Sequence, residues 1–122
     1  MKSSPHKMRF PKARRLTRSS EFERVKTTGQ SIQGRFLLLG FLAVGGDGPF
    51  RAGIITSKRI GEAIVRNRVR RRIREVVRTE QRRVRNGLWL VLIARRPAVH
   101  ASYATLKDEW LRLADRASIL AP

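Results

Sequence analysis

At 122 residues, the chain fits a single domain that can bury roughly two-thirds of the surface of its unfolded form. Its 28 Lys and Arg residues outnumber the 9 Asp and Glu residues, and the resulting net charge of +19 favours polyanionic partners such as nucleic acids. The lack of cysteine excludes disulfides and thiolate chemistry and agrees with a cytoplasmic location, and no apolar run approaches the roughly 20 residues of a membrane span, so we expect no membrane partner.

The N-terminal residues differ in character from the rest of the chain. Residues 1–18 are basic, polar and interrupted by proline, so we expect a flexible arm ahead of a folded domain over residues 19–118. A first helix is predicted to begin at Ser20, whose hydroxyl can form a capping box with Glu23 three positions later. Gly29 is the predicted end of this helix.

Two strands are predicted next. Residues 35–44 (RFLLLGFLAV) are apolar at nearly every position between turn-forming residues, which indicates a strand buried over most of its length. A turn over residues 45–49 (GGDGP) separates it from a second predicted strand, 50–58. Because the connection is short, we expect these strands to pair as an antiparallel hairpin.

From Gly61 the apolar pattern takes a helical period. At 100° per residue, the aliphatic side chains from Val65 onward fall within one arc of roughly 120°, and most of the arginines lie on the opposite side. The pattern predicts a helix of about 22 residues, packed on the core and carrying an arginine-rich outer face. Two arginines fit badly: Arg66 is expected to snorkel from the first turns, and Arg83 to lie where the helix ends.

The C-terminal third adds a strand and a helix. Residues 87–97 (GLWLVLIARRP) predict a third strand, and Ser102 is the predicted N-cap of a last helix. The apolar residues of that helix recur at steps of three and four and are expected to face the core: Tyr103, Leu106, Trp110, Leu113 and Ala117. The whole order predicts an α+β fold, a single-domain α/β sandwich in which helices pack on a small mixed sheet.

The sequence offers little for catalysis by the protein. Its two histidines, His6 and His100, stand alone, so no Ser-His-Asp or Cys-His arrangement is visible. The carboxylates are scattered and mostly neighbour arginines, so ion pairs and helix caps explain them better than acid–base work or a metal cluster. We therefore predict no catalytic residue and no metal or other cofactor bound by the protein.

The strongest functional signal is the acid-free segment 66–74 (RNRVRRRIR). Solvated helix faces usually mix charges of both signs, so this one predicts contact with nucleic acid. Its side chains suit phosphate groups rather than base edges, which favours structured RNA over DNA. A small ribosomal or other structural RNA-binding protein is the alternative. A DNA-binding regulator is a further alternative, and such a protein should discriminate duplex sequences and dimerise.

Three segments form a recognisable set: residues 57–75 (SKRIGEAIVRNRVRRRIRE), 15–29 (RLTRSSEFERVKTTG) and 90–98 (LVLIARRPA). They resemble, in this order, the signature, the first helix and the last strand of the bacterial ribonuclease P protein subunit. The resemblance implies a left-handed βαβ crossover, the rare hand. It also implies two RNA partners, the ribonuclease P catalytic RNA and precursor tRNA, whose 5′ leader the complex removes by endonucleolytic cleavage. The catalytic centre and its Mg²⁺ are then expected in the RNA, with the protein alone inactive.

The resemblance also assigns roles to residues. The surface for the catalytic RNA is implied to comprise Lys58, Arg59, Arg66, Asn67, Arg68, Arg70, Arg71, Arg72 and Arg74. The leader is implied to lie in a cleft between the first helix and the sheet, with Phe22 as a cleft aromatic and Phe36 as a weaker candidate. Lys26 and Gly40 stand where the family often has further cleft aromatics. The leader contact is therefore expected to be more electrostatic than stacking.

Overall fold

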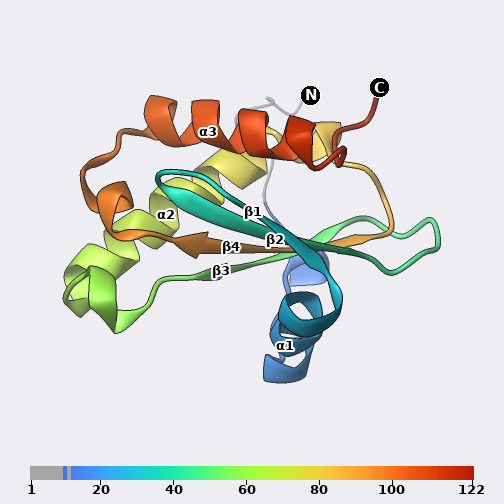
Figure 1. Cartoon of the computed structure of the whole chain (residues 1–122), viewed down its shortest axis with the longest axis horizontal. Coiled ribbons are helices and arrows are strands. Elements are labelled where there is room, and N and C mark those ends of the chain that lie inside the picture. The colour runs from blue at the N-terminus through green and yellow to red at the C-terminus, as the bar shows by residue number, and fades with distance from the viewer. Residues whose placement is uncertain (1–9, 11) are drawn as a thin grey trace, which may run out of the picture.

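The computed structural model describes residues 10 and 12–122, which form a four-stranded sheet and three α-helices (Figure 1). The helices are α1 (Ser19–Thr28), α2 (Ala63–Thr79) and α3 (Tyr103–Arg116). The strands are β1 (Gln30–Gln33), β2 (Leu37–Ala43), β3 (Arg51–Ile55) and β4 (Leu88–Ala94). Short 3₁₀ turns join them: η2 (Lys12–Arg14), η3 (Lys58–Ile60), η4 (Gln81–Arg83) and η5 (Arg96–His100). No helix in this part of the chain is long and apolar enough to cross a membrane.

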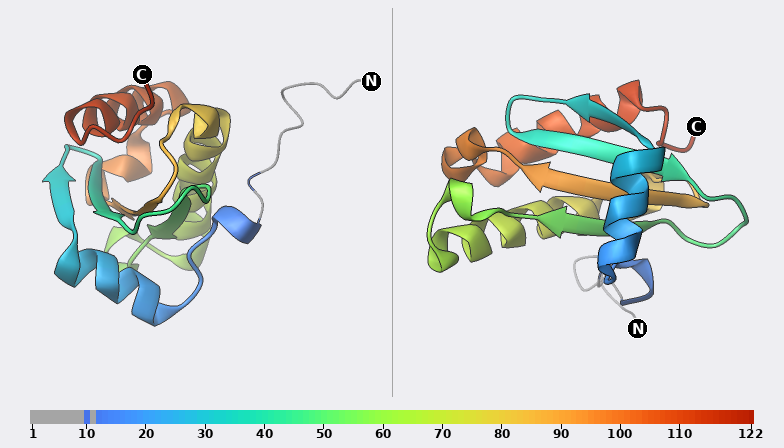
Figure 2. Two further views of the ribbon diagram at one scale, coloured as in Figure 1. Left: turned by 90° about the vertical axis from the view of Figure 1, so that its right-hand side faces the viewer. Right: turned by 60° about the horizontal axis from the view of Figure 1, so that its bottom comes forward.

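The sheet is mixed, as predicted, with the strand order β1-β2-β4-β3. β2 is antiparallel to both of its neighbours, whereas β3 runs parallel to β4. In the right-hand view of Figure 2, β3 and β4 point to the left, β4 lies above β3 and α2 passes behind the sheet, so the crossover is left-handed. The predicted hairpin of residues 35–44 and 50–58 is wrong, because β4 lies between β2 and β3 and pairs with both.

The two faces of the sheet are covered differently (Figure 2). α2 and α3 lie side by side on one face, called here the closed face, over a large core that includes Leu39 and Trp110. The other face, the open face, is crossed by α1 and has a smaller cluster around Val25 and Val91. The central strands β2 and β4 contribute to both clusters, which explains why they read as nearly continuous aliphatic runs.

α1 crosses the open face over a row of residues that pair across neighbouring strands. Gly40 of β2 pairs with Val91 of β4, which pairs with Gly53 of β3. A Cβ atom at Gly53 would lie 2.1 Å from Cε1 of Phe22, so only glycine leaves room for this ring. A Cβ atom at Gly40 would lie 3.5 Å from Cγ1 of Val25, an ordinary contact. The flat row therefore lets α1 pack close to the sheet.

The start of α1 differs from the predicted capping box. The carboxylate of Glu21, rather than Glu23, accepts hydrogen bonds from the backbone N–H groups of Thr17 and Arg18, both at 3.0 Å. Ser20 lies inside the helix and is not its cap. The predicted box is therefore displaced by two residues, because the chain enters α1 at Arg18.

The other helix ends follow the sequence more closely. Ser102 caps α3 as predicted, and its Oγ accepts a hydrogen bond from the N–H of Thr105 at 3.1 Å. α2 has 17 residues and ends at Thr79, earlier than predicted, after which η4 turns the chain toward β4. Arg83 lies in this turn, which confirms that its poor fit to the helical period marks the end of the helix.

The segment before α1 is packed against β3. Leu16 is buried, and its N–H donates to the carbonyl oxygen of Ala52 at 2.9 Å. Phe10 is also buried, with its ring centroid 6.0 Å from that of Phe50. The predicted arm is therefore wrong for residues 10 and 12–18, and its remaining residues, 1–9 and 11, lie outside the described residues.

Candidate RNA interface

The outward side of η3 and α2 carries four basic side chains, called here the free basic set: Lys58, Arg59, Arg68 and Arg71. All four are exposed. Within the part of the chain that the structure describes, none has a hydrogen-bond or ion-pair partner for its side chain. Arg68 and Arg71 are three residues apart on one helix face, so their cations are neighbours that can bind successive phosphates.

Three other arginines of α2, called here the tethered set, hydrogen-bond to the protein itself: Arg66, Arg70 and Arg72. Arg66 is half-buried and donates to the carbonyl oxygen of Gly61 at 3.1 Å. Arg70 donates to Thr56 Oγ1 at 2.6 Å, and Arg72 to the carbonyl oxygen of Ala101 at 3.1 Å. These contacts attach α2 to its neighbours on both sides and leave fewer donors for a ligand.

Asn67 and Glu75 are the two residues of α2 that complete the description of the free basic set and its surroundings. Asn67 is exposed, and its Oδ1 accepts a hydrogen bond from Arg70 at 3.0 Å, so its amide group remains available as a donor. The acid-free stretch ends at Glu75, which forms an ion pair with Arg78. Hydrogen bonding from Arg78 lowers the pKa of the Glu75 carboxyl, so the pair stays ionised and neutralised.

Beside α1, the open face forms a cleft with an apolar floor. The row next to the one under α1 consists of Leu38, Ile93 and Ile55, which pair across β2, β4 and β3 and are half-buried. A hollow of about 230 Å³ is lined by Lys26, Leu38 and Ile93. A second hollow, of about 130 Å³, is lined by Phe22 nearer β3. The cleft thus has an aromatic ring at one end and a cation at the other.

Phe22 and Lys26 lie between α1 and the sheet, in the position expected for leader-binding residues. Phe36 does not: it lines neither hollow and packs against the closed-face core, under the guanidinium of Arg35. Its backbone N–H donates to Glu109 Oε2 at 2.8 Å, which holds this turn toward α3. The expected place of Phe36 in the cleft is therefore wrong.

Arg74 differs from the other residues of the predicted surface for the catalytic RNA, because it lines a hollow to which they do not contribute. It lines the smaller hollow together with Arg15 and Phe22. Burial, and then the positive charges of Arg15 and Arg70, lower the pKa of the Arg74 guanidinium. No pattern in the sequence predicts this neighbourhood, because Arg15 precedes Arg74 by about 60 residues and was expected in a flexible arm.

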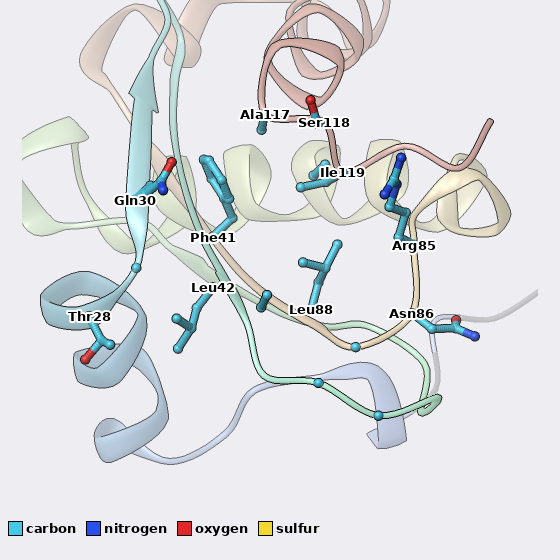
Figure 3. Close-up of a pocket in the computed structure, with 15 residues that line it drawn as sticks. Thr28, Gln30, Phe41, Leu42, Arg85, Asn86, Leu88, Ala117, Ser118 and Ile119 are labelled. Atoms are coloured by element: carbon cyan, nitrogen blue, oxygen red, sulfur yellow. The ribbon is translucent and has the colours of Figure 1, made fainter.

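A larger hollow of about 580 Å³ lies where the C-terminal ends of α1 and α3 approach the start of β4 (Figure 3). Phe41, Leu88 and Ile119 form its apolar lining, and Arg85 and Asn86 stand at its rim. Its lining has no histidine or carboxylate that could activate a nucleophile. The lining of this hollow therefore lacks the chemistry of a catalytic site.

The titratable groups elsewhere have structural roles. His100 is exposed at the end of η5, and His6 lies outside the described residues. In residues 10 and 12–122, no group of three or more His, Asp or Glu side chains is placed to hold a metal ion. Glu109 departs from the expected ion pairs and caps: it is only 3% exposed, and it accepts hydrogen bonds from three successive backbone N–H groups, those of Arg35, Phe36 and Leu37.

The sequence matches the family model "Ribonuclease P" over residues 10–118. The chain belongs to the ribonuclease P family. The ribonuclease P protein component of Symbiobacterium thermophilum is 36% identical over 109 residues, 89% of this chain and 95% of that one. That of Halalkalibacterium halodurans is 35% identical over 111 residues, 91% of this chain and 93% of its own.

Solved structures agree with this assignment. The Staphylococcus aureus RNase P protein has a TM-score of 0.81 at 25% identity, covering 90% of this chain and 100% of that one. The Thermotoga maritima RNase P protein has a TM-score of 0.75 at 26% identity, covering 84% of this chain and 96% of that one. Membership in the ribonuclease P family confirms the expected class of function, a protein subunit of an endoribonuclease ribonucleoprotein that takes part in tRNA processing.

Proposed function

We propose that this chain acts in ribonuclease P as a clamp with two RNA-binding sides. The free basic set and Asn67 bind the catalytic RNA, and the cleft beside α1 binds the 5′ leader of precursor tRNA. The observation that supports the first side is the group of four exposed cations that lack a protein partner within the described residues. Phosphate groups of the RNA replace water around these cations and offset their mutual repulsion.

The cleft supplies contacts that tolerate different leader sequences. The ring of Phe22 can stack on any base, because every base has a π-face. Lys26 provides a cation, and Leu38 and Ile93 an apolar floor. A strand held there is present in the precursor and absent from mature tRNA, so this side favours the substrate over the product.

In this proposal the chemical step and its Mg²⁺ ions belong to the RNA, and the chain contributes binding and electrostatics. Neutralised phosphates let RNA helices approach one another at a lower ionic strength. The complex should therefore need less Mg²⁺ than the RNA alone. A reducing cytoplasm, where precursor tRNA is made, is the proposed location.

The test is cleavage of a leader-bearing precursor tRNA at low Mg²⁺ by the cognate RNA, by the chain, and by both. We expect activity in the mixture only, and its loss when Arg68→Ala and Arg71→Ala are combined. Arg112→Ala on α3, an exposed arginine that pairs with Asp108, is the matched control and should keep full activity. Tight RNA binding without stimulation would point instead to a structural RNA-binding protein, and cleavage by the chain alone would overturn the assignment of chemistry to the RNA.

A further inference from the structure

We propose that Arg70 is a positioning residue of the RNA interface: anchored on Thr56, it engages the side-chain oxygen of Asn67 and so fixes the amide of Asn67 as a hydrogen-bond donor. The proposal rests on the proposed function for the class of partner, RNA. It goes further by removing Arg70 from the residues expected to touch the catalytic RNA, and by giving Thr56 a part in RNA binding.

Three side chains from two segments of the chain form a continuous hydrogen-bond network. Arg70 lies between the other two: its NH1 group donates to Asn67 Oδ1 at 3.0 Å, and its NH2 group donates to Thr56 Oγ1 at 2.6 Å. Thr56 follows β3 and is only 8% exposed, whereas Asn67 is exposed on α2. The network therefore connects a buried anchor with a polar group at the surface.

The chemistry of arginine decides which end of the Asn67 amide is engaged. A guanidinium group donates hydrogen bonds and accepts none, so only the oxygen of the amide can face Arg70. The NH2 group of Asn67 has no acceptor within residues 10 and 12–122 and is left for a ligand. Phosphate groups, ribose hydroxyls and base carbonyl groups all offer acceptor oxygens. A fixed donor therefore suits RNA, and a side chain that turned its oxygen outward would meet phosphate groups unfavourably.

The guanidinium group of Arg70 is already occupied by the protein. Its NH1 and NH2 groups both have acceptors, and the side chain is half-buried. Arg68 and Arg71 on the same helix are exposed, and neither has a partner in the part of the chain that the structure describes. An RNA phosphate could take the paired donors of Arg70 only by displacing the protein's own oxygens. Phosphate contacts therefore belong to Arg68 and Arg71, and Arg70 acts through Asn67.

The anchor on Thr56 makes this arrangement rigid. Without it, Arg70 and Asn67 would be an exposed pair three residues apart on a helix, whose hydrogen bond competes with water. A second bond to a buried hydroxyl restricts the rotamers of the long arginine side chain. Thr56 also lies just before η3, which carries Lys58 and Arg59, so the same bond holds the start of η3 against α2. The network thus connects both elements that carry the free basic set.

The first experiment measures the affinity of the full chain for the cognate catalytic RNA. Thr56→Val removes the hydroxyl without changing any charge, and we expect it to weaken binding about three- to tenfold, the effect of one neutral hydrogen bond. The dependence on salt should stay as in the wild type, because no phosphate contact is lost. Thr56→Ser keeps the hydroxyl and should restore the affinity. Thr79→Val, whose hydroxyl bonds to Tyr103 outside the network, is the matched control. No loss with Thr56→Val, or an equal loss with the control, would overturn the proposal.

A second experiment tests whether the effect passes through Asn67. In an Asn67→Ala background, Thr56→Val should change the affinity by less than about twofold, whereas Arg68→Ala should still weaken binding. Asn67→Asp keeps an oxygen for Arg70 and loses the donor, so it should bind RNA no better than Asn67→Ala. If the loss caused by Thr56→Val is undiminished in the Asn67→Ala background, the anchor acts by another route and the positioning role is contradicted.

The orientation of Asn67 can be measured without RNA. We expect Thr56→Val and Arg70→Ala to lower the NMR order parameter of the Asn67 side-chain amide. The amide of Asn86, the other asparagine of the chain, is the internal control and should not change. An Asn67 amide that is equally ordered in the wild type and in Thr56→Val would overturn the proposal. This result is independent of the proposed function, whose failure would instead appear as a wild-type chain that does not bind the catalytic RNA.

Discussion

The two faces of the sheet differ in how completely helices cover them. On the closed face, α2 and α3 cover the central parts of β2 and β4, and Leu39, Leu90 and Leu92 are at most 1% exposed. On the open face, α1 lies across the strands, and a helix about 10 Å wide covers roughly half of strands about 20 Å long. The uncovered half becomes the floor of the cleft. The closed face therefore holds most of the core, and the open face leaves strand residues accessible beside α1.

The largest effect is expected from Glu109 on the closed face. Glu109→Ala leaves three backbone N–H groups without an acceptor inside the protein and should lower the free energy of unfolding by about 3 kcal/mol or more. Urea unfolding followed by circular dichroism measures this. Asp108→Ala, which removes an exposed carboxylate one residue earlier, should stay within about 0.5 kcal/mol of the wild type. Equal effects of the two variants would contradict the structural role of Glu109.

A methyl group at Gly53 tests the open face. The new Cβ would collide with the ring of Phe22, so Gly53→Ala should cost about 1–3 kcal/mol and displace the ring from the cleft. Gly48→Ala is the matched control, because no atom lies within 4 Å of a Cβ placed there. Unfolding and binding of a leader oligonucleotide should both be measured. If Gly53→Ala keeps full leader affinity, Phe22 does not contribute to the cleft as proposed.

The arginines of α2 allow a residue that stabilises the fold to be compared with a residue available to a ligand on the same helix. Arg72→Ala removes the hydrogen bonds to the carbonyl groups of Val99 and Ala101 and should cost about 1 kcal/mol of unfolding free energy. Arg68→Ala should leave stability within about 0.5 kcal/mol and weaken binding to the catalytic RNA.

Salt dependence separates these two roles. With about six phosphates neutralised, log affinity for the RNA should fall against log salt with a slope of roughly −4 to −5, and Arg68→Ala should reduce the steepness by about 1. Arg72→Ala should change the slope less than Arg68→Ala does. A wild-type slope near about −1 would rule out the electrostatic clamp.

A further test of the open face concerns the dependence of stability on pH. Hydrogen bonding from the backbone of Arg18, with further help from Thr17 and Arg51, lowers the pKa of Glu21 from 4.5 to about 2. A carboxyl whose pKa is lower in the folded state stabilises the protein above its unfolded pKa, and this contribution is lost as the pH falls from about 4.5 through about 2. Glu21→Gln should flatten this part of the stability profile, and Glu23→Gln on the same helix serves as the control. An unchanged profile would contradict the role of Glu21 in holding α1.

The parts of the fold that follow from local chemistry were predictable from the sequence. The hydroxyl cap at Ser102, the stop at Gly29 and the end of α2 before Arg83 each depend on residues within a few positions. The arginine-rich face of α2 is a periodic pattern over several turns. These features need no knowledge of where the rest of the chain lies.

Several errors concern contacts that are distant in the sequence, whereas the displaced start of α1 and the missed strand β1 are local. A short turn between residues 44 and 50 is compatible with a direct hairpin as well as with the observed topology. Nothing in this turn shows that β4 lies between the two strands. β1 has the polar sequence QSIQ and is a strand because it pairs with β2. In the sequence, Glu109 cannot be distinguished from a surface acid. Only the fold brings the turn before β2 into contact with its carboxylate. The meeting of Arg15 and Arg74 has the same origin, and the left hand of the crossover came only from resemblance.

The bridge between the segment before α1 and β3 also affects whether two copies of this chain can pair along that strand. Within the sheet β3 has β4 on one side only, and an open strand edge is a template on which a second molecule can add a strand. Leu16 occupies the middle of that edge through its bond to Ala52, and Arg15 places a positive charge beside it. This bridge and the like charge beside it disfavour the pairing of a second copy along β3.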